Sequence, residues 1–64
     1  MFIQLTDDDT GQLFDVAARF VVAVKTRSPT TTEVYCSGLP EPFVVRETRH
    51  KVNERVRAMF EGGR

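Results

Sequence analysis

Cys36 and His50 are the only cysteine and the only histidine in the chain, and together they make its one candidate nucleophile–base pair. A thiol attacks as its thiolate, which a neighbouring imidazole can generate. Cys36, however, alternates with Val34 in a run that is typical of a strand, so we expect it to be a small buried hydrophobic residue. One cysteine and one histidine also cannot form a closed zinc site. We therefore expect no enzyme activity, no catalytic residue, no cofactor and no metal.

Three consecutive aspartates, Asp7 to Asp9, stand before Thr10 and Gly11. A calcium loop of the EF-hand type needs ligands at alternate positions and a glutamate that closes the loop. Here the acids are adjacent, and the closing position is occupied by Ala18. Aspartate and glycine are common turn residues, so the stretch predicts a turn.

Basic residues crowd around His50 at the start of a predicted helix. Because a helix N-terminus with basic side chains can hold a phosphate, these residues are candidates for anion or nucleic-acid contact. The candidates are Arg46, Arg49, Lys51, Arg55 and Arg57. Glu47 and Lys51 stand four residues apart in the favourable order, and the bases scatter around the helical wheel instead of forming one stripe. An ion-paired, solvated helix face is therefore the favoured interpretation.

The charge of the chain is balanced overall, with nine basic and nine acidic residues. Residues 1–17 hold four acids and no base, whereas residues 18–64 hold nine bases and five acids. A dedicated nucleic-acid-binding domain usually shows a stronger imbalance. A dimeric nucleic-acid-binding regulator is therefore our alternative function. Besides the bases near the helix it would use Arg19, Lys25 and Arg27.

The length of 64 residues allows one domain, which we assign to residues 1–64. The lone cysteine fits a reducing, cytoplasmic setting. We expect no signal peptide, because the N-terminus lacks a basic start and an apolar run. No apolar run approaches the roughly 20 residues of a membrane span, so we expect no membrane contact.

Alternating and β-branched residues predict strands at 2–5, 12–16, 30–37 and 43–47. Residues 16–25 are ambiguous. A helix would place an apolar face there, with Leu13, Val16, Ala17, Phe20, Val21 and Val24 along it. The β-branched residues favour a strand over residues 19–25 instead.

From Thr48 onward the apolar period becomes helical, with Val52, Val56, Met59 and Phe60 on one stripe. Thr48 is the expected N-cap, and Gly62 and Gly63 are the expected end. The predicted fold is α+β, a small antiparallel β-meander of four to five short strands followed by one C-terminal α-helix. The meander takes residues 2–47, the helix residues 48–61 and a flexible tail residues 62–64.

Strand side chains alternate between two faces, so each predicted strand offers two sets. The set expected to face the helix is Ile3, Leu5, Phe14, Val16, Phe20, Val22, Val24, Val34, Cys36, Phe43 and Val45. The opposite face is also apolar, with Phe2, Leu13, Val21, Ala23, Tyr35 and Val44. An exposed apolar patch usually marks an interface, and two-fold pairing is the commonest way to bury one. A curl of the sheet into a small barrel is the alternative.

We therefore expect a non-catalytic, homodimeric protein-interaction module. It would be an accessory or regulatory protein of a bacterium, with a protein partner that the sequence does not identify.

The order of the motifs also resembles the FlbD (SwrD-like) family of small bacterial flagellar proteins. The matching pieces are Leu5-Thr6, Gly11, "QLFDV", "TTEVYCSG" and "VVRETRHKVNERV". The resemblance implies a non-enzymatic accessory role in motility and carries over no catalytic residue. A weaker resemblance is to the carbon storage regulator family of dimeric RNA-binding proteins. Where those proteins have arginines after Leu-Thr, this chain has Asp7 and Asp8, which would repel phosphate.

Overall fold

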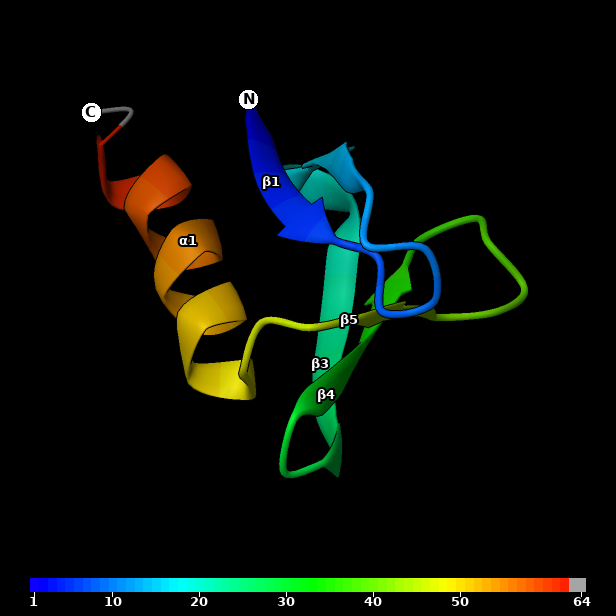
Figure 1. The fold of residues 1–64 in the computed structure, drawn as a ribbon. Coiled ribbons are helices and arrows are strands. Elements are labelled where there is room, and N and C mark those ends of the chain that lie inside the picture. Colours follow the sequence, from blue (N-terminus) through cyan, green and yellow to red (C-terminus); the bar gives the residue numbers. More distant parts are fainter. Residues whose placement is uncertain (63–64) are drawn as a thin grey trace.

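A computed structural model describes residues 1–62 and shows five short antiparallel strands followed by one C-terminal helix, an α+β domain (Figure 1). The elements are β1 (Phe2–Thr6), β2 (Leu13–Ala17), the 3-10 helix η1 (Ala18–Phe20), β3 (Val21–Ser28), β4 (Thr31–Cys36), β5 (Phe43–Val45) and α1 (Arg49–Gly62). The predicted fold class is confirmed. The predicted tail, apart from Gly62, lies outside the described residues, and Gly62 itself belongs to the helix.

β1 and β2 form a hairpin in which Ile3 pairs with Val16 and Leu5 with Phe14. The aspartate-rich stretch between them is a turn, as predicted. The Asp7 carboxylate accepts from the Asp9 backbone N–H at 3.1 Å and from the Thr10 hydroxyl at 3.2 Å. Gly11 has a φ of 75°, which a residue with a side chain rarely adopts. The first aspartate therefore stabilises the turn by local hydrogen bonds.

β3, β4 and β5 form a second sheet in that order, and its last strand joins the hairpin. The Asp8 N–H donates to the Val44 carbonyl and the Arg46 N–H to the Thr6 carbonyl, both at 2.9 Å. The ring centroids of Phe14 and Phe43 lie 4.9 Å apart across this junction. Backbone and aromatic contacts therefore hold the two sheets together around one core.

A bulge in β3 changes which side chains face that core. Val21 pairs with Cys36 and Ala23 with Tyr35, so Val22 is an extra residue opposite β4. Such a bulge breaks the alternation of inward and outward side chains. Val21, predicted for the outer face, packs against the core instead. Val22, predicted for the core, is 66% exposed, so both predictions were wrong.

The prediction for Phe20 was also wrong. This side chain is 45% exposed, because residues 18–20 form η1 rather than the start of a strand. The Arg19 guanidinium carbon lies 4.9 Å from the centre of the Phe20 ring, so the ring stacks with a cation at the surface.

α1 lies along β1 and β3 and covers the core on that side (Figure 1). Thr48 is its N-cap, as predicted, because its hydroxyl accepts from the Lys51 N–H at 3.2 Å. Val52 is fully buried, and Val56 and Met59 pack against the core. Phe60, predicted to pack on the sheet, is 58% exposed, so that prediction was wrong.

The core is formed by seven buried side chains from every strand except β2 and β3, together with η1 and α1. They are Ile3, Leu5, Ala18, Val34, Cys36, Val45 and Val52. In the part of the chain that the structure describes, no helix has the length and apolar character needed to cross a membrane.

Candidate interaction surface

The candidate nucleophile and base do not form a catalytic pair. Cys36 is buried at the end of β4, and burial raises the pKa of its thiol. A protonated, inaccessible thiol is a poor nucleophile. The His50 side chain is exposed at the start of α1, and its Nε2 lies 3.4 Å from Glu54 Oε2. Within residues 1–62, no group of three or more histidine, cysteine or acidic side chains could hold a metal ion.

The outer sheet face expected to form the dimer interface is interrupted. Phe2 and Leu13 are exposed, but they stand at opposite ends of the hairpin, with the pair Gln4 and Asp15 between them. Val21, as described above, packs against the core.

On the other sheet the three remaining members of that face, Ala23, Tyr35 and Val44, surround a charged residue. Glu33 pairs with Val44 on one side and with Lys25 on the other. The Tyr35 hydroxyl donates to Glu33 Oε1 at 2.8 Å, and this hydrogen bond to a carboxylate raises the pKa of the tyrosine. The outer face is therefore mixed and ion-paired, rather than one apolar patch.

Three of the five candidate anion-binding bases gather around one shallow hollow of about 260 Å³. Arg46, Lys51 and Arg55 line it together with Glu47 and Thr48. Arg49 lies at a different hollow with His50, and Arg57 is exposed outside both. The fold thus brings Arg46, Lys51 and Arg55 to one hollow, although the helical wheel indicated that the bases were scattered.

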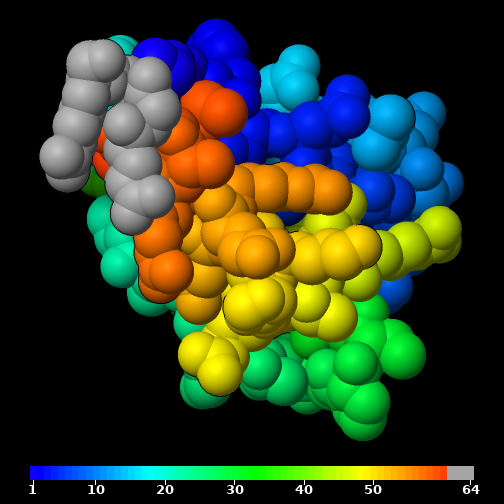
Figure 2. Space-filling model, turned by 90° about the vertical axis from the view of Figure 1, so that its left-hand side faces the viewer, coloured from blue at the N-terminus to red at the C-terminus, as the bar shows by residue number. Residues whose placement is uncertain are grey.

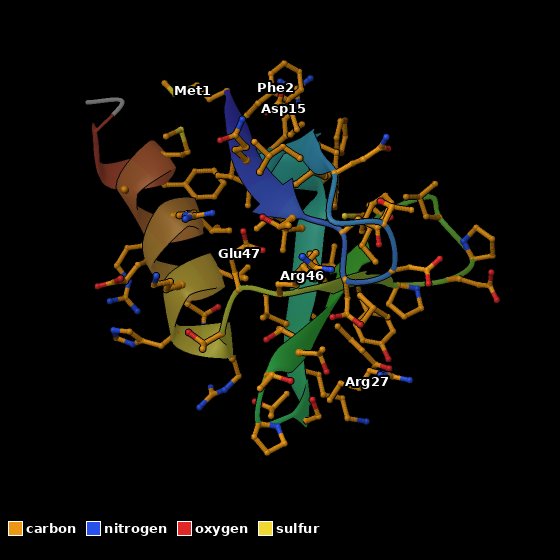
Figure 3. All side chains as sticks on the ribbon, in the orientation of Figure 1. Met1, Phe2, Asp15, Arg27, Arg46 and Glu47 are labelled. Atoms are coloured by element: carbon orange, nitrogen blue, oxygen red, sulfur yellow. The ribbon has the colours of Figure 1, made fainter. Side chains whose placement is uncertain are left out.

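Two of these three bases are engaged by oxygen atoms of the protein itself. Arg46 Nη2 donates to the Asp8 carbonyl at 3.1 Å, and its Nε lies 3.9 Å from the Asp8 carboxylate. Arg55 Nη1 donates to the Gln4 carbonyl and lies 3.5 Å from Glu47 Oε2. Figure 3 labels Arg46 and Glu47, which lie on the segment between β5 and α1. These contacts assign Arg46 and Arg55 a structural role.

Glu47 is the centre of the contacts that cover the free edge of β1. Its carboxylate accepts from the Thr6 N–H at 2.9 Å and from the Thr6 hydroxyl at 2.8 Å. Burial by itself would raise the pKa of Glu47, but the Thr6 hydrogen bonds and the nearby Arg55 charge outweigh it and lower this pKa. Backbone groups that β2 leaves free on β1 thus bind side chains from residues 47–55.

The free edge of β3 has no comparable cover. β3 pairs only with β4, which leaves its other edge without a strand in the described chain. An unpaired edge presents backbone N–H and C=O groups that can pair with another chain. Of its first four residues, Val22 and Ala23 are exposed.

A shallow hollow of about 200 Å³ lies at this edge, between α1 and β3, and a second of similar volume lies between the C-terminal part of α1 and residues 1, 18 and 19. One is lined by Val21, Val22, Ala23, Val24, Asn53 and Val56. The other is lined by Met1, Ala18, Arg19, Met59 and Phe60. We call both together the α1–β3 groove. Figure 2 shows the teal atoms of β3 emerging beside the orange atoms of the C-terminal half of α1.

The sequence did not point to this groove. Val22 and Phe60 were both assigned to the interior, because strict alternation and a helical stripe placed them there. The consecutive valines at 21 and 22, which leave either register equally apolar, were the only signal of a bulge. Nothing in the sequence indicated that Phe60 would extend past the sheet.

No family model, no curated protein and no solved structure matches this chain. The resemblances to the flagellar family and to the carbon storage regulators therefore stay predictions from short motifs.

Proposed function

We propose that this protein is a non-catalytic protein-interaction module that binds a strand of another polypeptide along the α1–β3 groove. The observation that carries the proposal is the unpaired edge of β3 next to exposed apolar side chains, Val22 and Phe60 among them. An extended segment added to such an edge gains main-chain hydrogen bonds, and adjacent pockets accept its alternate side chains.

The contrast with the other surfaces supports this choice. The basic hollow contains a glutamate, and two of its three bases are bonded within the chain. The outer sheet face is interrupted by Glu33 and Lys25. The α1–β3 groove combines unpaired backbone with apolar lining.

A capture experiment with matched variants tests the proposal. Val22→Glu adds a charge to the β3 edge, whereas Leu39→Glu adds the same charge in the loop before β5, where Leu39 is also exposed. A partner captured by the wild-type protein should be lost with Val22→Glu and retained with Leu39→Glu. The purified partner should then repeat this pattern in a binding titration. A partner that both variants retain would contradict the proposal.

Homodimerisation, expected from the sequence, is a separate proposal. It is supported by the small size of the domain and by its exposed apolar side chains. Light scattering after size-exclusion chromatography measures the mass directly. A monomer mass at micromolar concentrations would refute it.

Nucleic-acid binding is the second candidate function. It is favoured by one observation, the hollow around Arg46, Lys51 and Arg55. Binding of this kind weakens steeply with salt. An anisotropy titration at low salt that shows no binding to DNA or RNA would exclude it, and Lys51→Glu is the variant expected to weaken any binding that is seen.

A further inference from the structure

On the β3 side of the α1–β3 groove, the charged residues are all of one sign over a long stretch of chain. From Ala18 to Thr32 there are three bases and no acid. The bases are Arg19, Lys25 and Arg27, and all three side chains are exposed. Glu33 is the first acid after this stretch, and its contact with Arg27 is long, at 4.0 Å. The edge of β3 therefore carries a positive field that its own chain neutralises only in part.

Apolar and basic residues occupy different halves of the β3 edge. Val21 to Val24 form the half that lines the groove beside Val56. Lys25 and Arg27 follow in the half that runs to the turn at Pro29. A strand that matches this edge needs apolar side chains opposite the first half and carboxylates opposite the second.

A second copy of the chain fits this requirement poorly at β3. Pairing β3 with β3 of another copy joins two strands that both carry bases and no acid. Such a pair offers no carboxylate to Lys25 or Arg27. The complementary strand is therefore one with acidic residues.

We infer that the α1–β3 groove binds an extended, acidic segment of a partner protein, which adds as a fourth strand beside β3. This inference rests on the proposed function and names the chemistry of the partner. The backbone of the segment pairs with the free edge, its carboxylates lie near Lys25 and Arg27, and its apolar side chains enter the hollows beside Val56 and Met59.

Two labelled octapeptides provide the test, one with a valine half and a glutamate half and one in which lysine replaces each glutamate. We expect the glutamate peptide to bind at least about tenfold more tightly in low salt, and salt to weaken that binding. A glutamate peptide with two central prolines should lose binding, because proline cannot donate a main-chain hydrogen bond.

Protein variants locate the peptide. Lys25→Glu should weaken binding of the glutamate peptide by about tenfold, whereas Lys51→Glu, the same charge change on α1, should change it by less than about twofold. Far-ultraviolet circular dichroism confirms that each variant is folded. Equal binding of both peptides, or equal effects of both variants, would overturn the inference.

The inference and the proposed function fail in different ways. One outcome is that neither peptide binds while Val22→Glu still abolishes binding of a partner or of a second copy. In that case the proposal of an acidic segment is wrong, and the proposal that the groove is an interaction site is retained. If Val22→Glu changes no association at all, the interaction site is wrong as well.

Discussion

The free edges of β1 and β3 lie beside the same helix, yet side chains cover the backbone of β1 and leave that of β3 open. On β1 the Thr6 N–H donates to Glu47, and the Gln4 carbonyl accepts from Arg55. On β3 the neighbouring helix residues are Asn53 and Val56, and shallow hollows remain between the two elements. Long charged side chains can reach a strand edge and satisfy its backbone, whereas a short apolar side chain cannot.

The contacts on the edge of β1 hold the fold together, whereas the backbone groups on the edge of β3 are free to pair with another chain. Proteins commonly protect strand edges with charged side chains, because an open edge invites pairing with other chains. On β1 this protection comes from Glu47 and Arg55, two of the charged residues at 46–55. The open β3 edge is a place where a strand can be added without first breaking a contact of the described chain.

The largest expected effect comes from removing the cover of β1. Glu47→Ala leaves the Thr6 N–H without its partner and the Arg55 charge without its carboxylate. We expect a loss of about 2–3 kcal/mol in the free energy of unfolding, measured by chemical denaturation. Glu54→Ala is the control, since Glu54 forms only an exposed pair with His50 and should cost less than about 0.5 kcal/mol. Equal losses would show that Glu47 does not hold β1.

The bulge at the start of β3 predicts opposite outcomes at adjacent positions. Val21→Glu places a carboxylate against the core and should cost about 2 kcal/mol or more. Val22→Glu places it on the open edge and should change the free energy of unfolding by less than about 0.5 kcal/mol. The same denaturation measurement decides between them, and a reversed order would mean that the strand lacks this bulge.

The helical wall of the groove gives a smaller contrast. Val56→Ala should cost about 1 kcal/mol, because Val56 packs partly against the core. Phe60→Ala should have almost no effect on stability, since its ring is mostly in solvent. Melting temperatures of the two variants provide the comparison. A strongly destabilised Phe60→Ala would place that ring in the core.

Lowering the pH should weaken the contacts of Glu47 with β1, and its effect on stability should be smaller than those of the substitutions above. The pKa of Glu47 is lowered in the folded protein by the Thr6 hydrogen bonds and by Arg55, against the opposing effect of burial. Its contribution is complete above the pKa of the unfolded chain and is lost as the pH falls through the lower folded value. We expect wild-type stability to decline below about pH 4 relative to Glu47→Gln. The free energy of unfolding is measured against pH for both proteins, and parallel curves would contradict this prediction.

Much of the fold was readable from local patterns. The strand Thr31–Cys36 follows from its β-branched residues, and the change from a two-residue to a helical period at Thr48 marks the start of α1. The burial of Cys36, Val34 and Val52 was predicted correctly for the same reason. These features depend on residues that are close together in the sequence, so local patterns are enough to predict them.

The candidate surface was much less predictable. The six residues expected at the interface were chosen on the assumption that every strand alternates without interruption, and on β3 this assumption failed at Val21. A single extra residue at Val22 exchanges the two faces, and a short 3-10 helix brings Phe20 to the surface. Bulges of this kind depend on how β3 meets β4 rather than on the composition of β3.

The sequence by itself determined the strands other than β3, the helix with its Thr48 cap, and the distribution of charge between the two parts of the chain. Those properties follow from local propensity, periodicity and residue counts. Only the tertiary structure decided which charges are engaged, because Glu47 meets Thr6 across 41 positions of sequence. It also decided that the edge of β1 is covered and the edge of β3 open, since that depends on where α1 docks and on which side chains of residues 47–56 reach each strand.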